Sequence, residues 1–186
     1  MFALRFASLF LLSTTFVSAS PTSADAGLAV RASTADIQTV FNTLKGSTDT
    51  ILPQITSLVS GGTATDETVT PLINDLTAAL DTATASLATL SPIELRKRQS
   101  DDEIAELVAG ILTDVTNALD GLLGTASTIP ALGGLLAGVD VSLHQVLLGL
   151  EILLAGVLNL VANLLVDVAG LLRSLALGLT LAALGL

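Results

Sequence analysis

The last 56 residues of the chain, 131–186, constrain its fold most strongly because they are saturated with leucine. They hold 21 leucines and only five ionisable side chains, which are Asp140, His144, Glu151, Asp167 and Arg173. The apolar residues cover most of a helix circumference instead of forming one stripe. A helix that is apolar all round lies in a protein core or in a membrane. This half of the chain therefore has to be enclosed, inserted or adsorbed.

The length of this apolar half predicts that it folds back on itself. One continuous helix over residues 131–186 would be about 84 Å long at about 1.5 Å per residue. We therefore expect a break near Gly156 or Gly170. The two resulting arms would form a helical hairpin.

A membrane-spanning or pore-forming hairpin is a competing interpretation of the same segment. The spacing of Gly134 and Gly138 is that of a GxxxG helix-pairing motif. Between Asp140 and Arg173, however, the longest uncharged stretch is 152–166. That stretch is shorter than the ~20 residues that a membrane span needs.

The preceding half of the chain has a different composition. Residues 20–100 hold 24 serines and threonines, whereas residues 121–186 hold six. The chain is thus a block amphiphile, with a hydroxyl-rich half joined to a leucine-rich half. We expect the leucine-rich half to move to a hydrophobic boundary and the hydroxyl-rich half to face water or polysaccharide.

Two helices are predicted in the hydroxyl-rich half. The first spans residues 34–60, where Pro53 should kink or split it and the glycines at 61–62 should end it. The second has Pro71 at its first helical position. Its apolar residues alternate spacings of four and three, as in a coiled-coil seam: Val69, Ile73, Leu76, Leu80, Ala83, Leu87 and Leu90.

A third helix is predicted to begin with a capping box, in which Ser100 is the N-cap and Glu103 follows three residues later. Gly121 and Gly124 should end it. Its apolar stripe consists of Ile104, Val108, Ile111, Val115, Leu119 and Leu122. The predicted fold is all-α and bundle-like, with amphipathic helices followed by a very hydrophobic C-terminal helical hairpin.

The chain divides into four predicted parts. Residues 1–19 combine one arginine, an apolar stretch and small residues before a proline, which is the pattern of a secretory signal peptide. Residues 20–95 are the Thr/Ser-rich helical half, and 96–100 are a basic linker. Residues 101–186 are the helix with the acidic start and the leucine-rich half. We expect a secreted protein.

The basic linker is a candidate processing site. Arg96, Lys97 and Arg98 form a tribasic run of the kind that processing proteases of the secretory pathway cleave. Exposed linkers are where proteolysis concentrates. The alternatives are an ordinary solvated charge cluster or positive charge at a helix C-terminus, which the helix dipole favours. The intact mass of the secreted protein distinguishes processing from both alternatives, because cleavage separates the halves.

Nothing in the sequence points to catalysis, so we expect no enzyme and no cofactor. Cysteine is absent, and the single histidine, His144, should face solvent or pair with Asp140 one turn earlier. Catalytic-serine and phosphate-binding motifs are missing. A net charge of −10 argues against nucleic acid as a partner. The expected contacts are self-association, hydrophobic surfaces, wall polysaccharide or a lipid.

A family resemblance is carried by the run from Asp36 to Val40, the seam from Thr77 to Leu90, the lack of cysteine and the Leu/Gly/Ala-rich C-terminal half. In these features the chain resembles the cysteine-free small secreted structural proteins of mushroom-forming fungi. Those proteins coat aerial hyphae and extracellular matrix and act beside hydrophobins. A looser likeness is to fungal hydrophobic-surface-binding proteins. The resemblance implies no catalytic residues.

The expected function is that of a secreted, surface-active structural protein of the cell wall or extracellular matrix. It would assemble at hydrophobic interfaces and aid attachment or aerial growth. The alternative is a secreted helical binding module that carries a lipid or another apolar ligand. An enclosed apolar pocket would indicate the carrier, and an exposed apolar surface would indicate the coat protein.

Overall fold

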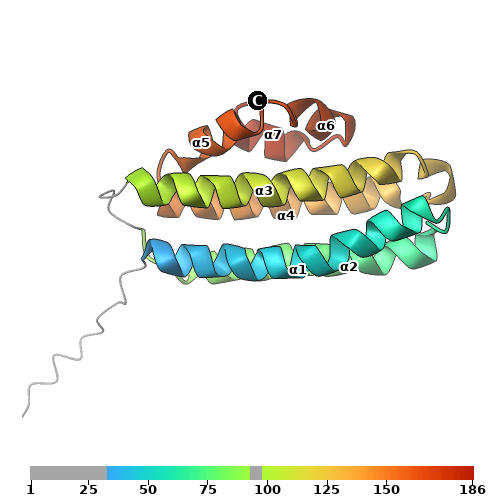
Figure 1. The fold of residues 1–186 in the computed structure, drawn as a ribbon, viewed down its shortest axis with the longest axis horizontal. Coiled ribbons are helices and arrows are strands. Elements are labelled where there is room, and N and C mark those ends of the chain that lie inside the picture. Colours follow the sequence, from blue (N-terminus) through green and yellow to red (C-terminus); the bar gives the residue numbers. More distant parts are fainter. Residues whose placement is uncertain (1–32, 93–97) are drawn as a thin grey trace, which may run out of the picture.

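The protein is an all-α bundle, as predicted (Figure 1). The computed structural model describes residues 33–92 and 98–186, with side chains of the second range from residue 101 on, and no strand occurs in these ranges. The helices are α1 (Thr34–Ser60), α2 (Asp66–Ala88), α3 (Arg98–Leu123), α4 (Leu132–Leu153), α5 (Val157–Leu164), α6 (Ala169–Ser174) and α7 (Gly178–Leu184), with a 3-10 turn at Ala126–Thr128. The predicted signal peptide, 1–19, and residues 96 and 97 of the basic linker lie outside the described residues.

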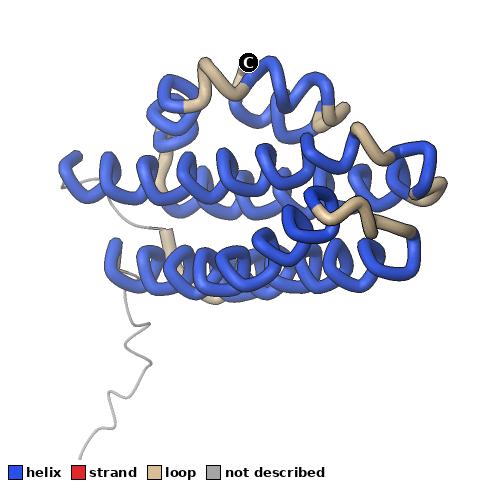
Figure 2. Tube along the Cα trace, turned by 45° about the vertical axis from the view of Figure 1, so that its right-hand side comes forward, coloured by secondary structure: helices blue, strands red, loops and turns tan. Residues whose placement is uncertain are grey.

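The helices stack in three layers. Helices α1 and α2 form one outer layer, α3 and α4 the middle layer, and α5, α6 and α7 the other outer layer (Figures 1 and 2). Helix α1 packs against α2 and α3, and α2 packs against α4. Helices α5 and α6 pack on α3, while α7 packs on α4. One continuous hydrophobic core runs through all three layers.

Helix α1 has the predicted bounds and a reciprocal cap at its start. The Ser33 backbone N–H donates to the Asp36 carboxylate at 2.7 Å, and the Asp36 N–H donates to Ser33 Oγ at 3.3 Å. The hydrogen bond from the Ser33 N–H, followed by one from the Ser33 hydroxyl at 2.8 Å, holds the pKa of the Asp36 carboxyl below its ordinary value. Of the two outcomes predicted at Pro53, a kink or a split, the split is wrong, since α1 continues through Pro53 to Ser60. Tertiary packing offsets the one backbone hydrogen bond that proline removes.

Helix α2 begins at Asp66, five residues before Pro71, which was predicted to be its first helical residue. Its cap is Thr65, whose backbone N–H donates to the Thr68 hydroxyl at 2.9 Å, and the first helical residue is Asp66. Pro71 therefore lies inside the helix, near its start. The local capping pair outweighed the proline preference for a first position. The predicted seam is confirmed from Val69 to Leu87, where every position is buried, whereas its last member, Leu90, is partly buried and follows the end of the helix.

Helix α3 carries its predicted apolar stripe, and every member from Ile104 to Leu122 is buried. The helix begins at Arg98, two residues before Ser100. The Ser100 side chain lies outside the described residues, so its capping role stays a prediction. Burial, and then the negative charge of Asp102, raise the pKa of Asp101 in the first turns.

The C-terminal half breaks at Gly156, one of the two predicted positions. Gly156 has φ +89°, a left-handed conformation that glycine adopts without steric cost. Gly170, the other predicted position, lies inside α6. Instead of a second long arm, the chain forms α5, α6 and α7. The turn between α6 and α7 contains Ala176, which has φ +58°.

Candidate functional surface

The buried carboxylate of Asp140 on α4 fastens the start of α7. It accepts hydrogen bonds from the backbone N–H groups of Leu179 and Thr180, both at 2.9 Å, and from the Thr180 hydroxyl at 2.7 Å. Asp140 is only 6% exposed. These bonds satisfy N–H groups that the first turn of a helix leaves without partners. The acidic residue in the apolar half thus has a structural explanation.

Two further polar residues of α4 fasten the same outer layer. The Glu151 carboxylate accepts from the Gly156 N–H at 2.8 Å and from the Leu158 N–H at 3.3 Å, at the start of α5. His144 Nδ1 lies 3.1 Å from the carbonyl oxygen of Leu179, so this nitrogen carries the donated proton. His144 does not pair with Asp140 as one of the two predictions had it, because the Asp140 oxygens accept hydrogen bonds from α7.

The layer formed by α5, α6 and α7 covers leucines that the first three helices alone would leave exposed. Leu147, Leu150, Leu165, Leu172 and Leu177 are at most 1% exposed. The apolar half therefore encloses most of its own surface. Of the three outcomes expected for this half, which were to be enclosed, inserted or adsorbed, the fold thus shows that much of its surface is enclosed.

An apolar surface nevertheless remains, and we call it the C-terminal apolar surface. Among the described residues, every large hydrophobic side chain that is exposed falls between positions 141 and 179. The set consists of Val141, Leu148 and Ile152 on α4, Leu164 on α5, Val166 after it, and Leu179 on α7. Ile152 is the most exposed of them, at 69%. All six belong to the leucine-rich half of the chain, and exposed apolar area concentrated there makes this half the candidate interaction surface.

The hydroxyl-rich half presents a different exterior. Threonine and serine hydroxyls on α1 donate to the carbonyl four residues earlier, as Thr39 and Thr43 do at 2.8 and 2.9 Å. On α2, Thr82 and Ser86 do the same at 2.7 and 2.8 Å. These hydroxyls keep free lone pairs, so the outer face of α1 and α2 accepts hydrogen bonds from water.

Three surface grooves lie along α1. The first, of about 390 Å³, runs between α1 and α2 and is lined largely by threonine, serine and alanine. The second, of about 740 Å³, lies between α1 and α3. The third, of about 520 Å³, lies between α1 and α2 near Pro53. All three open to solvent and combine hydroxyl or carboxylate groups with apolar side chains in their linings, so none of the three is the enclosed apolar pocket that a lipid carrier needs.

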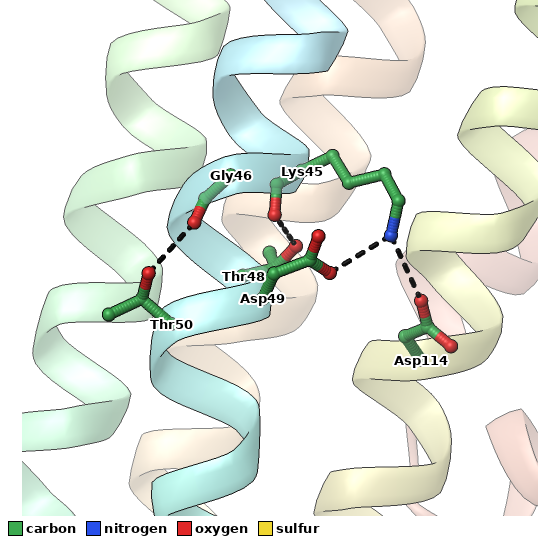
Figure 3. Close-up of polar contacts among 6 residues, drawn as sticks. All are labelled: Lys45, Gly46, Thr48, Asp49, Thr50 and Asp114. Carbon is green, nitrogen blue, oxygen red and sulfur yellow. Dashed lines mark hydrogen bonds and ion pairs between the residues drawn. The ribbon is translucent and has the colours of Figure 1, made fainter.

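A polar cluster beside the second groove joins α1 to α3 (Figure 3). The Lys45 ammonium lies 2.9 Å from a carboxylate oxygen of Asp49 and 3.7 Å from one of Asp114. The hydrogen bond to Asp49 is the main cause that raises the pKa of Lys45. All three side chains are about half exposed, so this cluster contributes little to stability.

The structure brings none of the predicted polar candidates together as a chemical site. Arg96 and Lys97 lie outside the described residues, as does the side chain of Arg98. The Glu103 carboxylate accepts a long hydrogen bond, 3.4 Å, from the Gln38 amide on α1. Within the described ranges, no three His, Asp or Glu side chains are grouped as metal ligands would be.

Helix α4 is long enough and apolar enough to cross a membrane. It has 22 residues, and 44% of its most apolar stretch is buried inside the bundle. The core helix of a bundle can meet the same criterion, and α4 packs against α2, α5 and α7 on part of its circumference.

Comparison with known proteins gives one partial relative. No known protein-family profile matches the chain. A stretch of 61 residues, 33% of this chain, is 56% identical to "Fruiting body differentiation protein 16" of Flammulina velutipes and covers 48% of that protein. The chain thus spans about half the length of the relative. The match supports the predicted likeness to proteins of mushroom-forming fungi, at the level of a fruiting-body protein.

Proposed function

We propose that this protein is a secreted, surface-active structural component of a fungal cell wall or extracellular matrix. It assembles at hydrophobic interfaces and aids attachment or aerial growth. No catalytic step is part of this proposal. The name of the relative, which refers to fruiting-body differentiation, is consistent with a role in tissue that grows into air.

The observation that carries the proposal is the uneven distribution of exposed side chains. The six members of the C-terminal apolar surface come from α4 to α7, and hydroxyls cover α1 and α2. Fully burying one such apolar side chain is worth about 1.5–3 kcal/mol. Since these six are roughly half exposed, their adsorption would contribute on the order of 5 kcal/mol, enough to orient the molecule at an oil-like boundary.

Site-specific labelling of the adsorbed protein tests this orientation. Because the chain has no cysteine, a single thiol can be introduced by Leu164→Cys or, as the matched control, by Thr43→Cys on α1. Both thiols react with a maleimide in solution. After adsorption to alkylated silica, we expect the thiol at 164 to be protected and the thiol at 43 to stay reactive. Equal reactivity of the two adsorbed variants would contradict the proposal.

The carrier alternative is separated by a titration in bulk solution. A lipid carrier takes up a fatty acid with a fixed stoichiometry, and its free energy of unfolding then rises with ligand concentration. The coat protein proposed here shows no such saturable stabilisation. Saturable binding without oriented adsorption would favour the carrier.

A further inference from the structure

The outward face of α4 has the spacing of a helix-pairing seam. Its positions alternate spacings of four and three residues, which keeps them on one side of a helix. The seam consists of Gly134, Gly138, Val141, Gln145, Leu148 and Ile152. All are exposed except Gly138, which is half-buried. We call this set the α4 seam, and it contains no ionisable side chain.

Side-chain size changes along the α4 seam. At its N-terminal end, a Cβ added to Gly134 or Gly138 would meet no atom within 4 Å, so the space above both glycines is open. At its C-terminal end, Leu148 and Ile152 project into solvent, 44% and 69% exposed. One helix face thus carries two open positions and two protruding apolar groups.

We propose that the α4 seam binds the α4 seam of a second copy of this chain, in an antiparallel arrangement. A two-fold axis beside Leu143 exchanges the two ends of the seam. Ile152 then packs on Gly134 of the second copy, and Leu148 packs on its Gly138. Val141 meets Gln145, and each contact occurs twice, as in any two-fold interface.

Size and charge together favour this occupant and this orientation. The chain carries a net charge of −10, so two copies repel unless they meet at an uncharged face, which the α4 seam provides. A parallel pair would set the two protruding Ile152 side chains against each other and leave the open glycines facing each other, whereas the antiparallel pair places each protruding side chain over an open glycine.

The pairing rests on the proposed function, because it uses α4 side chains of the C-terminal apolar surface and names their partner in solution. Leu164, Val166 and Leu179 lie outside the seam. They remain available for a hydrophobic boundary when two copies are paired.

Sedimentation equilibrium of the full secreted chain tests the pairing. We expect a monomer–dimer equilibrium for the parent protein. Gly138→Leu fills the open position, so the dimer should weaken by about tenfold or more, although the variant exposes more apolar area. The matched control is Gly133→Leu, which adds the same side chain to an equally open glycine outside the seam. The control should dimerise like the parent.

Cysteine cross-linking tests the orientation. Gly138→Cys mixed with Leu148→Cys should form a disulfide-linked dimer under mild oxidation. Either variant alone should not, because two identical positions lie about 15 Å apart along the axis at about 1.5 Å per residue. Disulfides need Cβ atoms about 4 Å apart.

Three results would overturn the pairing: a parent protein that stays monomeric, a Gly138→Leu variant that dimerises as tightly as the parent, or cross-linking of each cysteine variant with itself. The second result would indicate non-specific apolar association. Failure of the proposed function is distinguishable, since a protein that dimerises in solution but shows no oriented adsorption to alkylated silica would retain the pairing and lose the surface role.

Discussion

Asp140 and Thr180, 40 residues apart in the chain, are joined by two hydrogen bonds inside the bundle. The Asp140 carboxylate accepts from the Thr180 hydroxyl at 2.7 Å and from its backbone N–H at 2.9 Å. This contact holds the last helix against α4. The layer of α5 to α7, which covers the leucines of the core, depends on it.

Removal of this carboxylate should loosen the C-terminal layer. Asp140→Ala leaves the N–H groups and the hydroxyl at the start of α7 without an acceptor, at a cost of about 2 kcal/mol in the free energy of unfolding. Urea denaturation gives that value, and hydrogen exchange should quicken in residues 178–186. Asp167→Ala, at an exposed carboxylate, is the matched control and should change neither. Unchanged exchange in the Asp140 variant would contradict the structural role of this contact.

Two neighbouring positions on α4 separate core packing from surface exposure. Leu150 is fully buried and Ile152 is 69% exposed. Leu150→Ala should cost about 2–5 kcal/mol by loss of burial and the cavity left behind. Ile152→Ala should change the free energy of unfolding by less than about 0.5 kcal/mol. Calorimetry on both variants checks the difference, and equal destabilisation would place the exposed face of α4 inside the core.

The predictable part of the fold is the part with a clear period. The seam on α2 and the stripe on α3 repeat at helical spacing, so both the helices and their buried faces followed from the sequence. The region after Leu132 has no such contrast, because apolar residues cover the whole circumference. Its outward face, with Val141 and Ile152, was therefore hidden in the sequence, and so was the covering by α5 to α7.

The role of Asp140 depends on tertiary structure in the same way. Its position in an apolar run marked it as unusual, but its partner, Thr180, is brought near only by the turns at Gly156 and Ala176. Pro71 shows the opposite case. A strong local preference was overridden by another local signal, the Thr65 and Thr68 cap.

The cap at the start of α1 should make its stability depend on pH. Because hydrogen bonds from Ser33 lower the pKa of Asp36 in the folded state, the cap stabilises α1 above the ordinary aspartate range, and the stabilisation is lost as pH falls through the lowered value. Ser33→Ala removes the hydroxyl hydrogen bond and keeps the one from the backbone N–H, which contributes more, so the pKa of Asp36 should rise part of the way toward its ordinary value. A carboxyl NMR titration measures it, and the same pKa in both proteins would exclude the Ser33 hydroxyl from the cap.

The ion pairs of Lys45 with Asp49 and Asp114 should contribute little to the free energy of unfolding. Lys45→Gln removes contacts to Asp49 and Asp114 that are about half exposed, so the free energy of unfolding should fall by less than about 1 kcal/mol. The difference should shrink further at 1 M salt, where charges are screened. Thermal denaturation at low and high salt measures both effects. A large loss that persists in salt would mean that α1 and α3 depend on this link.

The most direct measurement is dynamic surface tension of the purified protein at the air–water boundary. One variant combines Ile152→Asp, Leu164→Asp and Val166→Asp on the C-terminal apolar surface. Its matched control places the same three charges at exposed hydroxyl positions, with Thr43→Asp, Thr50→Asp and Thr82→Asp. We expect the control to lower surface tension like the parent and the first variant to act more slowly and less. Equal curves for all three proteins would contradict an apolar surface as the working part of the molecule.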